Sequence, residues 1–119
     1  MNRKLKLDEL NRMDLEAFKK GSKTPIVVVL DNIRSLHNIG SVFRSCDAFA
    51  VEAIYLCGIT GTPPNKDIAK SALGATDSVL WKYFSETEAA VLELKEKGCV
   101  IISIEQTEKS ISLETYCPE

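Results

Sequence analysis

Apolar and polar residues follow one another along this chain in blocks that predict strands and helices in turn. The run from Ile26 to Leu30 is entirely apolar, as expected for a parallel strand that is covered on both faces. After a polar turn, apolar residues recur at helical spacing and predict an amphipathic helix, with Asn38 placed to cap it. The apolar positions of this helix are Ile39, Val42, Phe43, Cys46, Phe49 and Ala50.

The alternation continues toward the end of the chain. A second strand is predicted over Ala53 to Cys57, and two glycines and two prolines mark the stretch from Gly58 to Asn65 as a loop. Beyond it we predict a helix over Lys66 to Leu73, a strand near Ser78 to Phe84, a helix from a Ser85/Glu88 capping box to Lys97, and a strand over Cys99 to Ile104.

Residues 1–24 are predicted to form a separate amino-terminal helical arm. Leu7, Leu10, Met13 and Ala17 recur at near-helical spacing, and Asp14 is placed to cap a short helix that ends at Gly21. The segment that follows Gly21 breaks the helix and leads into the first strand.

Strands that alternate with helices predict an α/β fold, with a parallel sheet and right-handed crossovers. Ligands of such sheets bind outside the carboxyl ends of the strands. We therefore expect a site at the edge formed by three loops, which are Asp31–Asn38, Gly58–Asn65 and Glu105–Ser112.

The segment Asn38-Ile39-Gly40-Ser41-Val42-Phe43-Arg44 resembles the first motif, N-x-G-x-x-x-R, of the SpoU/TrmH family of RNA 2'-O-ribose methyltransferases, which belong to the SPOUT class. The segments Glu52–Gly58 and Lys70–Ala75 match the layout of that family as well, and the similarity runs from about Pro25 to the end of the chain. The family's second and third motifs, a Gly-Asn-Glu turn and a Ser/Asn-rich segment, do not occur before Glu119.

This resemblance implies a Rossmann-like parallel sheet with flanking helices, of SPOUT type, whose carboxyl-terminal trefoil-knot segment is missing. Residues 25–119 would then be an incomplete SpoU-type methyltransferase domain. Ending at Glu119 is expected to leave the apolar flank of the strand that contains Ile101 under-covered.

The resemblance also assigns roles. It implies S-adenosylmethionine as the cofactor, tRNA or rRNA as the substrate, and a homodimer in the full-length protein. Arg44 and Asn38 would be catalytic. The residues expected to contact RNA are Asn32, Arg34, His37, Gly40 and Ser41, and those at the edge of the cofactor site are Glu105, Gln106 and Thr107.

Simpler explanations exist for several of these residues. Arg44 can solvate a helix face or pair with Asp47, and Asn38 can serve only as a helix cap. A local packing requirement would explain Gly40 equally well. His37 is a candidate general base, although a lone loop histidine is more often structural.

Charge and composition narrow the function further. The net charge is −2, but residues 1–24 hold seven Lys/Arg against four Asp/Glu, so a basic arm is available for phosphate contacts unless it is only a solvated helix face. The longest apolar run has five residues and the first residues are charged, which predicts a cytoplasmic chain without a membrane span. Four cysteines without a C-x-x-C pair and one histidine predict no metal site, and the apolar patterns around Cys46 and Cys57 predict buried free thiols in preference to disulfides.

Three functions compete on this evidence. The leading one is an RNA 2'-O-methyltransferase, present as a truncated domain. A noncatalytic RNA-binding or dimerisation module on the same sheet is the alternative. A dinucleotide-dependent oxidoreductase is disfavoured, because the turn after the first strand lacks the G-x-G-x-x-G spacing that such enzymes use.

Overall fold

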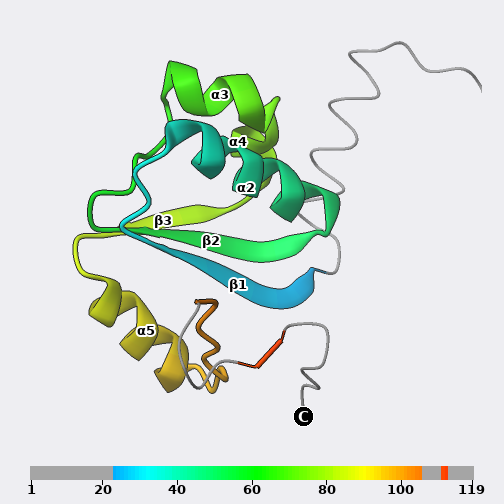
Figure 1. Cartoon of the computed structure of the whole chain (residues 1–119). Coiled ribbons are helices and arrows are strands. Elements are labelled where there is room, and N and C mark those ends of the chain that lie inside the picture. Colours follow the sequence, from blue (N-terminus) through cyan, green and yellow to red (C-terminus); the bar gives the residue numbers. More distant parts are fainter. Residues whose placement is uncertain (1–22, 106–110, 113–119) are drawn as a thin grey trace, which may run out of the picture.

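A three-stranded parallel sheet organises the computed structural model, which describes residues 23–105 and 111–112 (Figure 1). The strands are β1 (Thr24–Asp31), β2 (Val51–Cys57) and β3 (Trp81–Phe84), in the order β1-β2-β3. Leu30 pairs with Leu56, and Leu56 pairs with Tyr83. The predicted parallel α/β architecture is confirmed.

Helices cover both faces of this sheet. The helices α2 (Leu36–Ala48), α3 (Lys66–Ala72) and α4 (Ala75–Ser78) lie on one face, and α5 (Thr87–Glu96) lies on the other (Figure 1). The short helix α4 is bound to α2 through the Ser78 hydroxyl, which donates to Asp47 Oδ1 at 2.9 Å. Asp47 therefore has a structural partner within the described residues, and it is not Arg44.

The alternating side chains of β2 separate two cores. Ile54 and Leu56 are fully buried with Ile39, Phe43 and other residues of the α2 face. Tyr55 and Cys57 are buried on the α5 face, against Ala90 and Leu94. A strand buried on both faces has no polar side to present, which explains the continuous apolar run from Ile54 to Cys57 in β2.

Several predicted boundaries were wrong for local reasons. The cap of α2 is Ser35, whose side chain accepts from the Asn38 backbone N–H at 3.1 Å, so Asn38 lies inside the first turn. Ser85 and Glu88 form no capping box, because α5 begins one residue later with Glu86 as its N-cap and without a side-chain cap bond. The third strand starts only at Trp81, since Ser78 ends α4.

The strand predicted over Cys99 to Ile104 is absent, because residues 99–105 pair with no strand of the described sheet. Residues 1–22 of the predicted amino-terminal helical arm lie outside the described residues, as does Cys117, and Thr24 belongs to β1. Cys46 and Cys57 are buried free thiols, as expected, and burial raises the pKa of Cys46 to about 11.

Within the described ranges, no helix has both the length and the apolar character needed to cross a membrane. In the same part of the chain, no three His, Cys, Asp or Glu side chains gather where a metal ion would bind.

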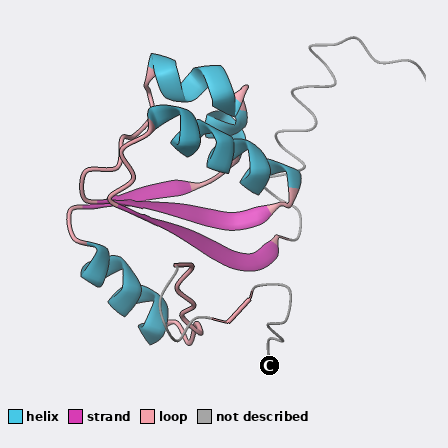
Figure 2. Cartoon of the chain, in the orientation of Figure 1, coloured by secondary structure: helices cyan, strands magenta, loops and turns pink. Residues whose placement is uncertain are grey.

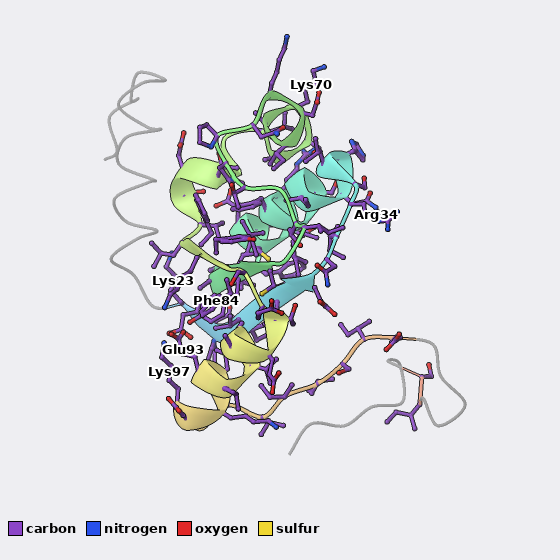
Figure 3. All side chains as sticks on the ribbon, turned by 90° about the vertical axis from the view of Figure 1, so that its left-hand side faces the viewer. Lys23, Arg34, Lys70, Phe84, Glu93 and Lys97 are labelled. Carbon is purple, nitrogen blue, oxygen red and sulfur yellow. The ribbon has the colours of Figure 1, made fainter. Side chains whose placement is uncertain are left out.

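A polar network on the α5 face joins the sheet to its covering helix. The Tyr55 hydroxyl and the Lys82 ammonium each donate to the Glu93 carboxylate at 2.8 Å, and Lys97 lies 3.6 Å from the same carboxylate. Figure 3 shows Glu93 and Lys97 together beside Phe84. The hydrogen bonds from Lys82 and Tyr55 lower the pKa of Glu93 to about 2.

This network predicts acid sensitivity. Because the pKa of Glu93 is lower in the folded state, the ionised carboxylate stabilises the fold at pH values above the ordinary carboxyl pKa of 4.5. This contribution to the free energy of unfolding is lost as the pH falls toward 2. We expect the free energy of unfolding, measured by urea denaturation, to fall less steeply over this pH range in Glu93→Gln than in the parent. Glu96→Gln on the same helix should keep the parent slope, and equal slopes for Glu93→Gln and the parent would contradict the assignment.

Candidate functional site

The loops that follow β1 and β2 meet at the carboxyl edge of the sheet (Figure 2), where one buried hydroxyl joins them. Thr60 Oγ1 donates to carbonyl oxygens of the two strand ends, with Cys57 O at 2.7 Å and Leu30 O at 3.1 Å. The same oxygen accepts from the Ile33 N–H at 3.0 Å. Sequence reasoning missed Thr60, because its loop carries only glycine and proline signals.

Asn32 is fixed in an unusual backbone conformation at this edge. Its φ is +52°, in the left-handed region that asparagine tolerates better than most residues. Its side-chain oxygen accepts from the Ile59 N–H at 2.9 Å, and its amide donates to Asp31 at 3.1 Å. A Cβ at Gly58 would overlap the side-chain oxygen Oδ1 of Asn32, so this contact needs glycine. The expected RNA contact Asn32 therefore also braces the loop.

A polar cleft of about 440 Å³ opens beside Asn32. Its charged lining groups are all carboxylates, and the Thr87 hydroxyl donates to Asp31 across it at 2.6 Å. The residues that line the cleft are Asp31, Asn32, Gly58, Ile59, Ser85, Glu86, Thr87 and Glu88. An acidic cleft of this kind disfavours RNA phosphates and suits cationic or hydroxyl groups.

Arg44 lies on an exposed strip of α2 with His37 and Ser41. Positions i, i+4 and i+7 of a helix share one face, so these three side chains follow one line along α2. Ser41 Oγ donates to the His37 carbonyl at 3.1 Å, and Arg44 is exposed. Among the described residues Arg44 makes no hydrogen bond or ion pair, which contradicts the alternative of a pair with Asp47.

Gly40, which was expected to contact RNA, does not lie on this exposed strip. It is buried against α3, where a Cβ would overlap the Ser71 hydroxyl and the Ile68 carbonyl oxygen and would lie 3.0 Å from Ala72 N. Ser71 Oγ donates to the His37 carbonyl at 2.8 Å across the same contact. Gly40 thus serves helix packing, and it cannot contact RNA directly.

The remaining predicted residues are placed as follows. Asn38 is exposed in the first turn of α2, and Arg34 is exposed in the loop that precedes it (Figure 3). Both lie at the same end of α2 as His37 and Asn32. Glu105 is exposed, whereas Gln106 and Thr107 lie outside the described residues. The structure therefore brings the RNA candidates Asn32, Arg34 and His37 to one end of α2, and it describes one of the three cofactor candidates.

Comparison with known proteins identifies this arrangement. The sequence model of the SpoU rRNA Methylase family matches residues 25–118. The chain belongs to the SpoU rRNA methylase family. The motif that contains the buried Gly40 and the exposed Arg44 lies inside this match.

Individual SpoU relatives agree with the family match. The chain is 30% identical over 90 residues to the 23S rRNA (guanosine-2'-O-)-methyltransferase RlmB of Vibrio parahaemolyticus. The aligned region covers 76% of this chain and 36% of that protein. The crystal structure of the A. aeolicus TrmH/SpoU tRNA modifying enzyme is similar with a TM-score of 0.60 and 26% identity, over 79% of this chain and 47% of that one.

A third comparison concerns the fold alone. The SpoU methyltransferase AviRb of Streptomyces viridochromogenes is similar with a TM-score of 0.58 and 19% identity, over 80% of this chain and 35% of that one. The chain thus spans about a third to a half of the length of the relatives it matches.

The described residues do not by themselves fit S-adenosylmethionine. The polar cleft offers carboxylates for the amino group and the sulfonium of this cofactor, but no cation lines it to receive the carboxylate. Two of the three predicted cofactor residues lie outside the described part of the chain.

The packing of Gly40 gives a stability prediction. Gly40→Ala should destabilise the fold by about 1–3 kcal/mol through overpacking, and this outweighs the gain of up to about 1 kcal/mol in helix propensity. Ser45→Ala, at an exposed position of the same helix, should be neutral or slightly stabilising. Chemical denaturation of both variants makes the comparison.

A second variant separates side-chain from backbone crowding at Gly40. Adding Ser71→Ala to Gly40→Ala should not restore stability, because the Ile68 carbonyl remains in the way. Full recovery in the double variant would show that only the hydroxyl excludes a side chain.

Proposed function

We propose that this chain is the RNA-positioning part of an RNA 2'-O-ribose methyltransferase, with S-adenosylmethionine as the methyl donor. The observation that carries the proposal is the position of Arg44. A cation exposed on a buried, well-packed helix, within the family's first motif and without a partner among the described residues, is available for a ligand. Residues 25–119 would form part of the methyltransferase domain, and residues 1–24 an arm.

The chemistry explains why an arginine suits this position. A ribose 2'-hydroxyl must be aligned with the methyl group and must lose its proton as it reacts. The pKa of arginine exceeds about 12, so it cannot act as an ordinary base. A guanidinium can instead hold a phosphate and the ribose hydroxyl together and stabilise the charge that develops on the oxygen. Arg44 is proposed to do this.

Neighbouring residues would hold the RNA around Arg44. His37 and Ser41 lie on the same strip, and Asn32, Arg34 and Asn38 lie at the end of α2 beside them. Asn38 is proposed to contact the RNA with its exposed side chain, since the capping role belongs to Ser35. The names of the relatives cover both rRNA and tRNA enzymes, so either RNA is a candidate substrate.

The cofactor site would need residues beyond those described, and we derive no step through it. A cytoplasmic homodimer is proposed for the whole protein by analogy with the family. The alternative, a noncatalytic RNA-binding or dimerisation module, is favoured by one observation, which is the missing fit of the described residues to the cofactor.

Substitution of Arg44 in the whole protein tests the function. Arg44→Ala should change the free energy of unfolding by no more than about 0.5 kcal/mol, because the side chain is exposed. Loss of a transition-state contact should cost roughly 3 kcal/mol, or about a hundredfold in the rate of methyl transfer into RNA. Arg44→Lys should also fail, since a point charge does not reproduce the planar fork of the guanidinium.

The control is Lys95→Ala, which removes an exposed cation from α5 on the opposite face of the sheet and should leave the rate unchanged. Near-normal turnover by Arg44→Ala would remove the catalytic assignment. A parent protein that binds RNA but transfers no methyl group would favour the noncatalytic module.

A further inference from the structure

Tyr83, near the carboxyl end of β3, reaches across to the loop that follows β2. Its hydroxyl donates to the Gly58 carbonyl oxygen at 2.7 Å. The Gly58 N–H donates to Phe84 O at 3.0 Å. Both backbone polar groups of Gly58 are therefore held by residues at the end of β3.

A single planar peptide group links the Tyr83 contact to Asn32. The Gly58 carbonyl and the Ile59 N–H belong to the same peptide, in which the two groups point in opposite directions. Tyr83 donates to the carbonyl, and the N–H donates to Asn32 Oδ1 at 2.9 Å. A donor on the carbonyl also polarises the peptide and strengthens the hydrogen bond that its N–H makes. Tyr83 thus orients the group to which the Asn32 side chain is bound.

The Asn32 amide has one fixed orientation as a result. Only its oxygen can accept the Ile59 N–H, so its nitrogen faces Asp31, whose Oδ1 accepts from it at 3.1 Å. An amide nitrogen carries two hydrogens. The second hydrogen has no acceptor among the described residues, and Asn32 is exposed. Asn32 therefore presents one N–H donor to a ligand at the carboxyl edge of the sheet.

The group that suits this donor is a ribose hydroxyl. The carboxylate of Asp31 lies beside the Asn32 amide, where it repels phosphate but can accept a hydrogen bond from a hydroxyl. A ribose 2'-hydroxyl is both a donor and an acceptor, so it can bond to Asn32 and Asp31 together. Within an RNA strand it is also the only free hydroxyl of the sugar.

The carboxyl edge has another anchor that does not involve Tyr83. The buried Thr60 hydroxyl already ties the ends of β1 and β2 together. Tyr83 is 45% exposed, so water can replace its hydroxyl at the Gly58 carbonyl with little effect on the fold. Water does not supply a fixed direction for the peptide group, and this direction is what the Tyr83 hydroxyl adds.

We propose that Tyr83 is a positioning residue for RNA binding. Through the peptide group that it holds, it keeps the Asn32 amide oriented so that the second N–H donates to a ribose 2'-hydroxyl of the RNA. The inference rests on the proposed function, which supplies the RNA, and it adds Tyr83 and the chemical class of the contact. Because the contact reads the sugar and not the base, it distinguishes RNA from DNA of any sequence.

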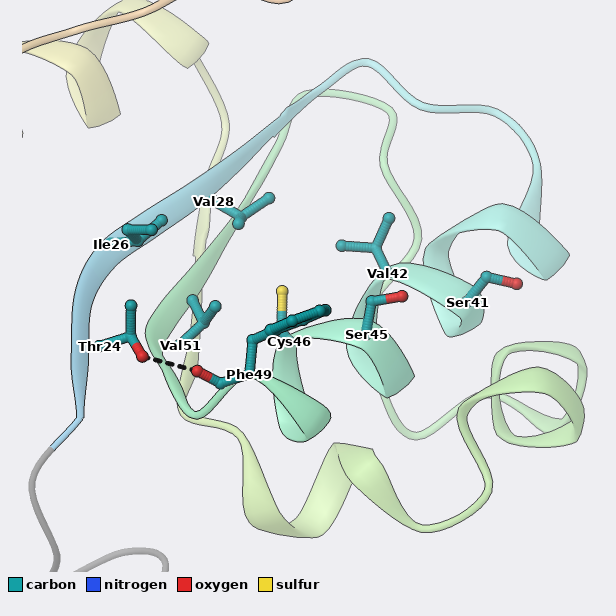
Figure 4. A pocket seen from close by; sticks show the side chains of 9 residues that line it. All are labelled: Thr24, Ile26, Val28, Ser41, Val42, Ser45, Cys46, Phe49 and Val51. Carbon is teal, nitrogen blue, oxygen red and sulfur yellow. Dashed lines mark hydrogen bonds between the residues drawn. The ribbon is translucent and has the colours of Figure 1, made fainter. Parts of the chain in front are cut away.

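Amide hydrogen exchange of the full chain, followed by NMR, tests the link without RNA. Tyr83→Phe removes only the hydroxyl, and the Ile59 amide should then exchange about threefold faster or more. The matched control is Thr24→Val, because Thr24 Oγ1 donates to Phe49 O at 2.6 Å at the amino edge of the sheet, beside the apolar hollow between β1 and α2 (Figure 4). This variant should leave the Ile59 amide unchanged. Equal exchange of this amide in Tyr83→Phe and the parent would overturn the proposal.

The ratio of the dissociation constants for DNA and RNA tests the ribose contact. The probes are single-stranded RNA and DNA oligonucleotides of matched sequence, and binding is followed by fluorescence anisotropy. Asn32→Gly removes the donor and suits the left-handed backbone at this position, so the ratio should fall by about two- to tenfold, as expected for one lost hydrogen bond. Tyr83→Phe should lower the ratio by a smaller factor, and Thr24→Val should keep the parent ratio.

The outcomes separate this inference from the proposed function. Protected amides in β2 show that each variant remains folded. A ratio that Asn32→Gly leaves unchanged would overturn the ribose contact, although the catalytic assignment of Arg44 would stand. A ratio that falls in Asn32→Gly but not in Tyr83→Phe would overturn the positioning role of Tyr83. A parent chain that binds neither probe would overturn the proposed RNA-positioning function and this inference with it.

Discussion

Burial of β2 on both faces is the constraint on which the other elements depend. Ile54 and Leu56 require a cover on one side, and Tyr55 and Cys57 require one on the other. Neither cover can be water, since each fully buried apolar side chain contributes about 1.5–3 kcal/mol relative to an exposed one. The three helices above the sheet and α5 below it meet this requirement, and the sheet becomes the middle layer of the molecule.

The proposed site follows from the way α2 meets that requirement. One side of α2 inserts Ile39 and Phe43 into the core, and Gly40 allows α3 to approach the helix backbone closely. The side that remains carries His37, Ser41 and Arg44. A rigid helix thus presents a cation to solvent at a fixed distance from the carboxyl edge, and the proposed orientation of an RNA ribose would use this geometry. Packing and the proposed function use different residues of the same motif.

The loops at the carboxyl edge depend on a smaller set of polar contacts. Thr60 joins the ends of β1 and β2, and Asn32 joins the β1 loop to the β2 loop. These contacts hold backbone groups that no strand can satisfy once the sheet has ended. These polar contacts therefore fix the backbone of the loop that leads into α2. The exposed side chains of Arg34, His37 and Asn38 extend from this fixed backbone.

The sequence by itself determined the order and type of most elements, from β1 through α5, and the family motif in α2. Apolar periodicity reports which residues need burial, and this was enough to predict a two-sided sheet. It could not assign Gly40 to packing or the cap to Ser35, because a glycine or a short polar side chain has the same local propensity whether a second helix lies against it or not. It also missed Thr60, because two of its three partners, Leu30 and Ile33, lie far from it in the chain. The strand expected over Cys99 to Ile104 had the right composition, but strand structure requires a partner edge, and only the tertiary arrangement decides whether an edge is paired.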